Sequence, residues 1–255
     1  RSTSAAVGDF NGDGRPDLAL ITQGKLRLFY QSAHGFETRV YVDLEVEADQ
    51  IGAADLDGDG HADLFALLPD GAPRIYWGGP GRPDPERYTD VVVGAPADRG
   101  TARELKQVSA EERVGAVAPL ARIIALGPVR HLFVPLAQRT FLVPVNRDRT
   151  LGAPLVFGCG NTVSVASGDF NGNGCTDLVF VGRERCAQGE CGWIYWGLEE
   201  GFDEDRRTPL PTSWACDVAC GDLDGNGCDD IAVCQQQSDQ SFSIHSLVYR
   251  GTPQG

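Results

Sequence analysis

The chain has 255 residues, of which 36 are Asp or Glu and 22 are Lys or Arg, and its formal net charge is −14. Hydrophobic residues make up 42% of it, which is enough for a packed core and argues against intrinsic disorder. No run approaches the length of about 18 apolar residues that a membrane-spanning helix needs, and the acidic balance argues against nucleic acid as a partner, because phosphates would be repelled.

An Asp/Gly-rich segment recurs along the chain. It reads GDFNGDGRPDL at 8–18, ADLDGDGHADL at 54–64, GDFNGNGCTDL at 168–178 and GDLDGNGCDDI at 221–231. The long interval between the second and third copies has room for one more unit, and VGAVAPLARIIAL at 114–126 fits the frame with Ala116 in place of the leading aspartate. Self-similarity at a period of about fifty residues is typical of a repeat architecture.

Each unit predicts several short strands. The segment is followed by an apolar run (DLALI, DLFAL, RIIAL, DLVFV or DIAVC), which predicts a second strand buried on both faces. Aromatic strands follow further on, at 26–30, 74–78, 193–197 and 246–251. No window shows helical periodicity. The sequence therefore predicts an all-β protein, a β-propeller of four-stranded blades with five repeat units.

The units are expected to form a single domain over 1–255. Their predicted limits lie near 1–46, 47–107, 108–158, 159–211 and 212–255, with first strands beginning near Ala5, Gly52, Arg113, Val163 and Cys216. The last unit is short, so its fourth strand is expected to be absent or supplied from beyond the termini. Either a five-bladed ring or part of a larger propeller fits. The chain contains no Met, so we expect a processed chain or a segment of a longer protein.

The four complete segments have the chemistry of a cation-binding loop. Positions 1, 3, 5 and 9 are Asp or Asn, position 7 offers a backbone carbonyl, and glycines at positions 4 and 6 permit a tight turn. A set of oxygen ligands alone favours Ca²⁺ over Mg²⁺. The candidate ligands of about four Ca²⁺ ions are Asp9, Asn11, Asp13, Arg15 and Asp17; Asp55, Asp57, Asp59, His61 and Asp63; Asp169, Asn171, Asn173, Cys175 and Asp177; and Asp222, Asp224, Asn226, Cys228 and Asp230, with Arg15, His61, Cys175 and Cys228 acting through their carbonyl groups.

Two other interpretations of these loops are weaker. An EF-hand requires Glu at position 12. That position is occupied by Leu20, Ala66, Phe180 or Val233. A purely polar turn would suit one copy, but four copies that each keep Asp at position 9 favour a site. Because affinity rises with ligand charge, we expect the Asp55 site to be the tightest and the Asp169 site the weakest. The unit with Ala116 is predicted to be metal-free.

These loops resemble those of the FG-GAP/VCBS repeat family, which includes the calcium-binding blades of integrin alpha-subunit propellers. The resemblance covers almost the whole chain and implies a β-propeller with calcium between the first and second strands of a blade. It also implies an adhesion or protein-interaction module. Integrin propellers have seven units, and this sequence shows five. VVVGAP at 91–96 echoes the motif that names the family, without a complete preceding Phe-Gly.

Eight cysteines lie between 159 and 234, which favours disulfides and an oxidising compartment over a zinc site. Cys186 and Cys191 flank a segment that can form a turn, so they are an obvious local pair. Cys234 is expected to pair with Cys220 or with Cys216. We expect almost no free thiol in denaturant without reductant, and a secreted or cell-surface location.

The function predicted from these features is binding without catalysis. The four histidines are scattered, and no recognised catalytic motif occurs. The expected ligand is an extracellular protein, with calcium in a structural role. The alternatives are a glycan-binding propeller, with Trp77 and Trp196 as equivalent stacking platforms, or a non-catalytic domain appended to a secreted enzyme. The polar stretches 79–88 and 97–106 are further candidates for a binding loop.

Overall fold

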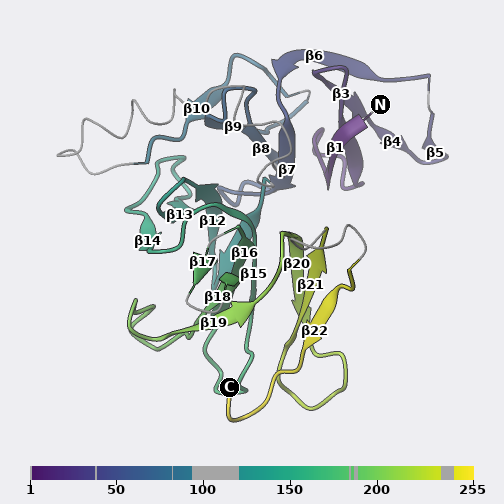
Figure 1. Ribbon diagram of the computed structural model, residues 1–255. Helices are drawn as coiled ribbons and strands as arrows, with labels where there is room; N and C mark the ends of the chain where they lie inside the picture. The colour runs from purple at the N-terminus through teal and green to yellow at the C-terminus, as the bar shows by residue number, and fades with distance from the viewer. Residues whose placement is uncertain are drawn as a thin grey trace.

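The computed structural model describes all residues except 1, 38, 82, 94–120, 184, 187–188 and 237–243. Its regular secondary structure in the described ranges consists of β-strands, all paired antiparallel, which confirms the all-β prediction (Figure 1). Among the same residues there is no helix with the length and apolar character needed to cross a lipid bilayer.

The described strands form five sheets of three or more strands in chain order, together with one two-stranded sheet. The first sheet consists of β1 (Ser2–Gly8), β2 (Asp17–Thr22), β3 (Lys25–Phe29) and β6 (Val42–Glu47), and β4 (Gln31–Ser32) pairs separately with β5 (Gly35–Phe36). The second consists of β7 (Gln50–Ala54), β8 (Asp63–Leu67), β9 (Pro73–Tyr76) and β10 (Tyr88–Asp90). The third consists of β11 (Ile123–Leu126), β12 (Val129–Pro135), β13 (Thr140–Val145) and β14 (Leu155–Phe157).

The two C-terminal sheets are less regular. The fourth consists of β15 (Thr162–Gly168), β16 (Asp177–Gly182), β18 (Gly189–Tyr195) and β19 (Arg207–Pro211), with β17 (Arg185–Cys186) paired to β18. The fifth consists of β20 (Ala215–Gly221), β21 (Asp230–Gln235) and β22 (Leu247–Tyr249). Three strands therefore form the last sheet within the described residues, as expected for the short final unit.

Consecutive sheets pack against one another through their first strands. Contact runs from β1 to β7, from β7 to β11, from β11 to β15 and from β15 to β20, along the path from purple to yellow in Figure 1. An apolar cluster fills each of these four interfaces, and each cluster draws its side chains from two neighbouring sheets. This succession of sheets is the arrangement expected of blades.

The second strands show why the apolar runs are unbroken. In β8, Leu64 packs toward the first sheet and Phe65 toward the third. In β16, Leu178 packs toward the third sheet and Val179 toward the fifth. Strands with a sheet on both sides need apolar residues at every position, as the sequence predicted.

The first and last sheets are different, because each has one described neighbour. Burial in β2 alternates along the strand, since one face of that strand packs on the second sheet. Position 2 of the loops shows the same effect: Phe10, Leu56 and Phe170 are at most 4% exposed, whereas Leu223 in the last sheet is 64% exposed. Among the described strands, no comparable contact joins β20 to β1, so no closed ring is seen.

The third sheet corrects one prediction. RIIAL was expected to be a second strand that follows a degenerate loop, but Ile123–Leu126 is β11, a first strand in contact with β7 and β15. A two-residue turn at Gly127 joins β11 to β12 in the place where other sheets carry the Asp/Gly loop. The predicted alignment of this unit with the other repeats was wrong, because an apolar run is the same signal in a first strand and in a second strand. Arg113, Ala116 and the rest of 94–120 lie outside the described residues.

In the structure the thiols of Cys175, Cys216, Cys220, Cys228 and Cys234 are free. A bond between Cys220 and Cys234 is contradicted by strand register, because Cys220 pairs with Ile231 and Cys234 with Asp217. Cys216 is the neighbour of Cys234, with its Sγ 3.4 Å from the Cys234 carbonyl oxygen. The side chain of Cys186 lies outside the described part of the chain.

Candidate metal centre

The four Asp/Gly segments form loops between the first and second strands of their sheets. We name them by their first residues: the Asp9 loop (9–17), the Asp55 loop (55–63), the Asp169 loop (169–177) and the Asp222 loop (222–230). Every predicted ligand lies in one of them. The glycines at positions 4 and 6 have φ between +68° and +88°, the left-handed region that glycine enters without strain, as predicted.

The aspartate at position 1 shapes each loop. Its carboxylate accepts hydrogen bonds of 2.7–3.2 Å from the backbone N–H groups of positions 4, 5 and 6 in the Asp9, Asp55 and Asp222 loops, and of positions 5 and 6 in the Asp169 loop. Burial alone would raise the pKa of Asp9, but the backbone donors, led by Gly14, lower it overall. The donors, led by Gly227, likewise lower the pKa of Asp222.

The aspartate at position 9 closes each loop from within the protein. Asp17, Asp63, Asp177 and Asp230 are at most 1% exposed. One oxygen accepts the N–H of position 2, and the other accepts an N–H from the segment after the third strand, at 2.7–3.1 Å. This carboxylate therefore ties the loop to its own sheet.

Burial makes these inner carboxylates costly to ionise. Burial, with the nearby negative charges of Asp57 and Asp59, raises the pKa of Asp63 to about 7. Burial also raises the pKa of Asp17 and of Asp177, and neighbouring aspartates add to both effects. A bound cation would remove this penalty by neutralising the cluster.

The Asp55 loop brings its carboxylates closest to a metal-binding arrangement. One oxygen from each of Asp55, Asp57 and Asp63 lies within 4.8 Å of the others. Oδ1 of Asp55 accepts two backbone bonds, but Oδ2 of Asp55 and the oxygens of Asp57 and Asp63 accept one bond each. These oxygens keep a lone pair, so the loop can hold the shape seen here and still offer ligands. Buried carboxylates of raised pKa and an oxygen-only donor set fit a hard cation of the calcium type.

The loops are joined in two pairs by a hydrogen bond that we call the latch bond. The N–H of Ala62, at position 8 of the Asp55 loop, donates to the carbonyl of Asp9 at 2.9 Å. Asp229, at the same position of the Asp222 loop, donates to the carbonyl of Asp169 at 2.8 Å. Position 8 of the Asp9 loop is Pro16, which has no N–H to give.

Side chains at position 7 strengthen the same contacts. The His61 ring covers Gly12, and the Sγ of Cys228 lies beside Gly172, so a side chain at either glycine would meet the neighbouring loop. Both glycines thus serve close packing between loops as well as the turn itself. The predicted role of the position-7 carbonyl groups as ligands stays a prediction.

Two residues that contact the loops were not predicted from the sequence. The Asp229 carboxylate accepts the N–H of Asp169 at 2.9 Å, a further link in the second pair. Arg149, from the turn between β13 and β14, contacts Asp57 and Asp59 of the Asp55 loop. Nothing in the sequence signals the Arg149 contact, because about ninety residues separate it from its partners.

The comparison with known families identifies the two regions of the chain that hold the paired loops. A model of the FG-GAP-like repeat matches residues 9–66 and 169–233. The chain carries FG-GAP-like repeats. Each matched region holds one latched pair of loops, and the third sheet, which has no Asp/Gly loop, lies between the two regions. No curated protein matches the chain.

The two tryptophans predicted as stacking platforms pack between neighbouring sheets. Trp77 is 4% exposed in the cluster between the second and third sheets, and Trp196 is partly buried between the fourth and fifth. Their Nε1–H groups donate to Thr89 and Thr208 at 2.9 Å in each case. Trp77 is therefore a core residue, and its burial removes the observation that favoured sugar stacking.

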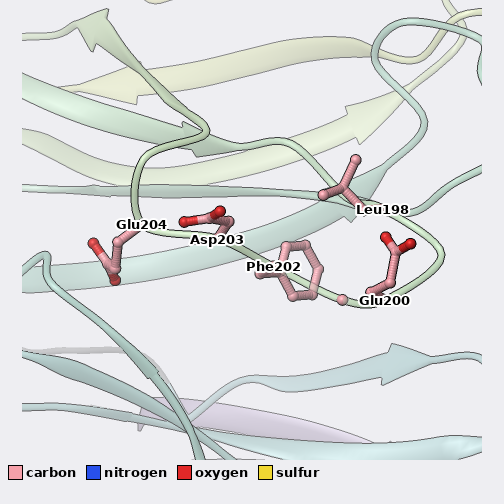
Figure 2. Close-up of a pocket in the computed structure, with 6 residues that line it drawn as sticks. Leu198, Glu200, Phe202, Asp203 and Glu204 are labelled. Carbon is pink, nitrogen blue, oxygen red and sulfur yellow. The ribbon is translucent and has the colours of Figure 1, made fainter.

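A hollow outside the loops lies on the connection from β18 to β19. Figure 2 shows its lining side chains, among them Phe202 and the carboxylates of Glu200, Asp203 and Glu204. Glu204 already accepts the N–H of Gly158 at 2.6 Å and the hydroxyl of Tyr195 at 3.1 Å. These bonds give it a structural role in holding the connection to the third and fourth sheets.

Proposed function

We propose that this protein is a calcium-binding β-propeller that acts as an extracellular protein-interaction module, secreted or on the cell surface. FG-GAP-like repeats suggest a protein-interaction propeller, and the succession of four-stranded sheets is consistent with blades. The proposal assigns no catalysis to the chain. Calcium would make the loops rigid and so fix the surface that meets the partner.

The observation that carries the proposal is the shared geometry of the four loops. Each one gathers carboxylates around positive-φ glycines, and in the Asp55 loop three of them converge within 4.8 Å. Such a cluster is self-repelling without a cation. The residues that would hold calcium are the Asp and Asn side chains at positions 1, 3, 5 and 9, and calcium would supply charge neutralisation rather than chemistry.

The test is a calorimetric titration of metal-free protein with Ca²⁺, together with thermal unfolding with and without EDTA. We expect about four bound ions, and about three in Asp55→Ala/Asp59→Ala. Asp70→Ala, at an exposed aspartate outside the loops, is the control and should still bind about four Ca²⁺ ions. Absence of Ca²⁺ binding would refute the metal sites. An unchanged melting temperature with EDTA would refute their structural role.

The interaction surface is proposed on the loop side of the sheets, where calcium would act. The polar stretch 97–106 lies outside the described residues, so it stays a sequence-based candidate. A pull-down from extracellular fractions, with and without EDTA, tests the role of calcium in partner binding. Recovery of the same partners from metal-free and calcium-loaded protein would contradict it.

A further inference from the structure

The turn between β13 and β14 presents Arg149 to the second sheet. The N–H of Asn146 donates to the Thr150 carbonyl at 2.9 Å, and Asp148 accepts both the N–H and the hydroxyl of Thr150. Arg149 itself has φ of +66°, an uncommon conformation for a residue with a side chain. The turn is therefore held in a defined shape with Arg149 at a fixed place.

The guanidinium of Arg149 bridges two candidate calcium ligands. Its Nε lies 2.5 Å from Oδ2 of Asp57, and a terminal nitrogen lies 2.8 Å from Oδ2 of Asp59. The side chain of Asp57 is 2% exposed and that of Arg149 is 26% exposed, so this ion pair is partly shielded from water and is less screened than a surface pair. The guanidinium also lies 5.3 Å from the centre of the Trp77 ring.

Arginines at two other loops come from the same sheet as the loop. Arg15 pairs with Asp13 inside the Asp9 loop, and Arg250 reaches Asp224 and Asp230 from the end of its own sheet. Within the described residues, the Asp55 loop is the one whose carboxylates are bridged by an arginine from a neighbouring sheet. The third sheet has no Asp/Gly loop of its own but supplies a cation to the loop before it.

We propose that Arg149 is a resident cation of the Asp55 loop, which Ca²⁺ must displace, so that calcium at this loop releases the turn of the third sheet. The inference rests on the proposed calcium binding and concerns one of its sites. A calcium ion coordinated by Asp57 and Asp59 at about 2.3–2.6 Å would lie close to the guanidinium. Two cations at that separation repel strongly in a shielded site.

The consequence is an order of Ca²⁺ affinities among the four loops that differs from the order based on ligand charge. The Asp55 loop has four carboxylates among its candidate ligands, more than any other loop, but Arg149 opposes the metal there. The site becomes weaker than its carboxylate count predicts, and its occupancy is coupled to the contact between the second and third sheets. When calcium leaves, the arginine returns and keeps the cluster neutralised.

The test compares the Ca²⁺ titration of the metal-free protein with that of Arg149→Gln, Arg149→Lys and the control Arg139→Gln, which changes an exposed arginine in another turn of the third sheet. We expect Arg149→Gln to bind Ca²⁺ at least tenfold more tightly at one site and unchanged at the others. Arg149→Lys keeps the charge and should stay within about threefold of the original protein. Arg139→Gln should leave the affinity of every site within the same margin.

A second measurement follows the protein without metal. In EDTA, Arg149→Gln should melt at a lower temperature than the original protein, because its carboxylates are no longer neutralised, and saturating Ca²⁺ should remove that difference. If Arg149 had only a structural role, Arg149→Gln would lower the melting temperature equally with EDTA and with Ca²⁺ and would leave all Ca²⁺ affinities unchanged. That result would overturn this inference but not the proposed calcium function. Absence of Ca²⁺ binding by the original protein would overturn both this inference and the proposed calcium function.

Discussion

The Asp9–Asp55 pair of loops and the Asp169–Asp222 pair share one latch bond but differ in what surrounds it. The first pair has seven aspartates among its candidate ligands, with Ala62 at position 8, and the second has five, with Asp229 there. The first pair is followed by a sheet that covers Leu56, whereas in the second pair Leu223 is exposed. The comparison shows that the backbone arrangement is fixed by positions 1, 9 and the glycines, while charge and packing vary around it.

Calcium removal should have the largest effect on both pairs. At ten times the dissociation constant, each site contributes about 1.4 kcal/mol, so four sites contribute roughly 5–6 kcal/mol to the free energy of unfolding. Denaturant unfolding with and without EDTA measures the total. The variants Asp9→Ala/Asp55→Ala and Asp169→Ala/Asp222→Ala should each retain part of the EDTA effect. If either variant lost the whole effect of EDTA on the free energy of unfolding, only one of the two pairs would contribute calcium-dependent stability.

The next largest effect is expected at position 2 of the loops, where the side chain is buried in some loops and exposed in another. Phe170 is buried between the fourth and fifth sheets, so Phe170→Ala should cost about 3–5 kcal/mol. Leu223→Ala changes an exposed side chain at the equivalent place and should stay within about 0.5 kcal/mol. Urea unfolding of both variants gives the comparison. A large loss in Leu223→Ala would show that another part of the protein covers this residue in solution.

The pH dependence of metal-free protein distinguishes the inner carboxylates. The folded pKa of Asp63, about 7, is above the unfolded value near 3.8, so the folded state binds this proton more tightly. Its contribution to stability is therefore complete below about pH 4 and is lost as the pH rises to 7, by at most about 1.4 kcal/mol per pH unit. Denaturant unfolding in EDTA across that range measures the slope.

Two variants serve as the control for this slope. Asp63→Asn should flatten it, because the titrating group is gone. Asp177→Asn should flatten it less, because one neighbouring carboxylate adds to burial there rather than two. The same slope in Asp63→Asn as in the original protein would assign the pH dependence to other groups.

The smallest expected difference lies at position 8. Asp229→Ala removes the carboxylate that accepts the Asp169 N–H and gives the second pair the residue found in the first. The latch bond is made by the backbone and should persist, so we expect a loss of about 1–2 kcal/mol. Ala62→Ser in the first pair is the control and should change stability by less. A loss above about 4 kcal/mol would mean that the side chain, not the backbone, holds the second pair together.

The sequence predicted what depends on local chemistry. The all-β class follows from the short apolar runs, and the loops follow from glycines that need positive φ beside Asp and Asn. The first strands of four sheets lie where the repeats placed them. These features are set by residues within a few positions of one another.

Features that depend on distant residues were missed or misplaced. The strands of the third sheet were misassigned because no Asp/Gly loop follows Ile123–Leu126 to mark its end. Its contacts with β7 and β15 show that this segment is a first strand. Arg149 and Asp229 became part of the site through packing between sheets. Burial of Trp77 likewise depends on the neighbouring sheet.

Pro16 gives the row of loops a direction. Every latch bond runs from an N–H at position 8 to the carbonyl of the loop before it, and Pro16 has no such N–H. A unit set ahead of the Asp9 loop would leave its own carbonyl without this donor, whereas a unit set after the Asp222 loop would complete the bond with any residue but proline at position 8. The series of latch bonds is therefore polar: the Asp9 loop accepts such a bond through its carbonyl group but cannot donate one.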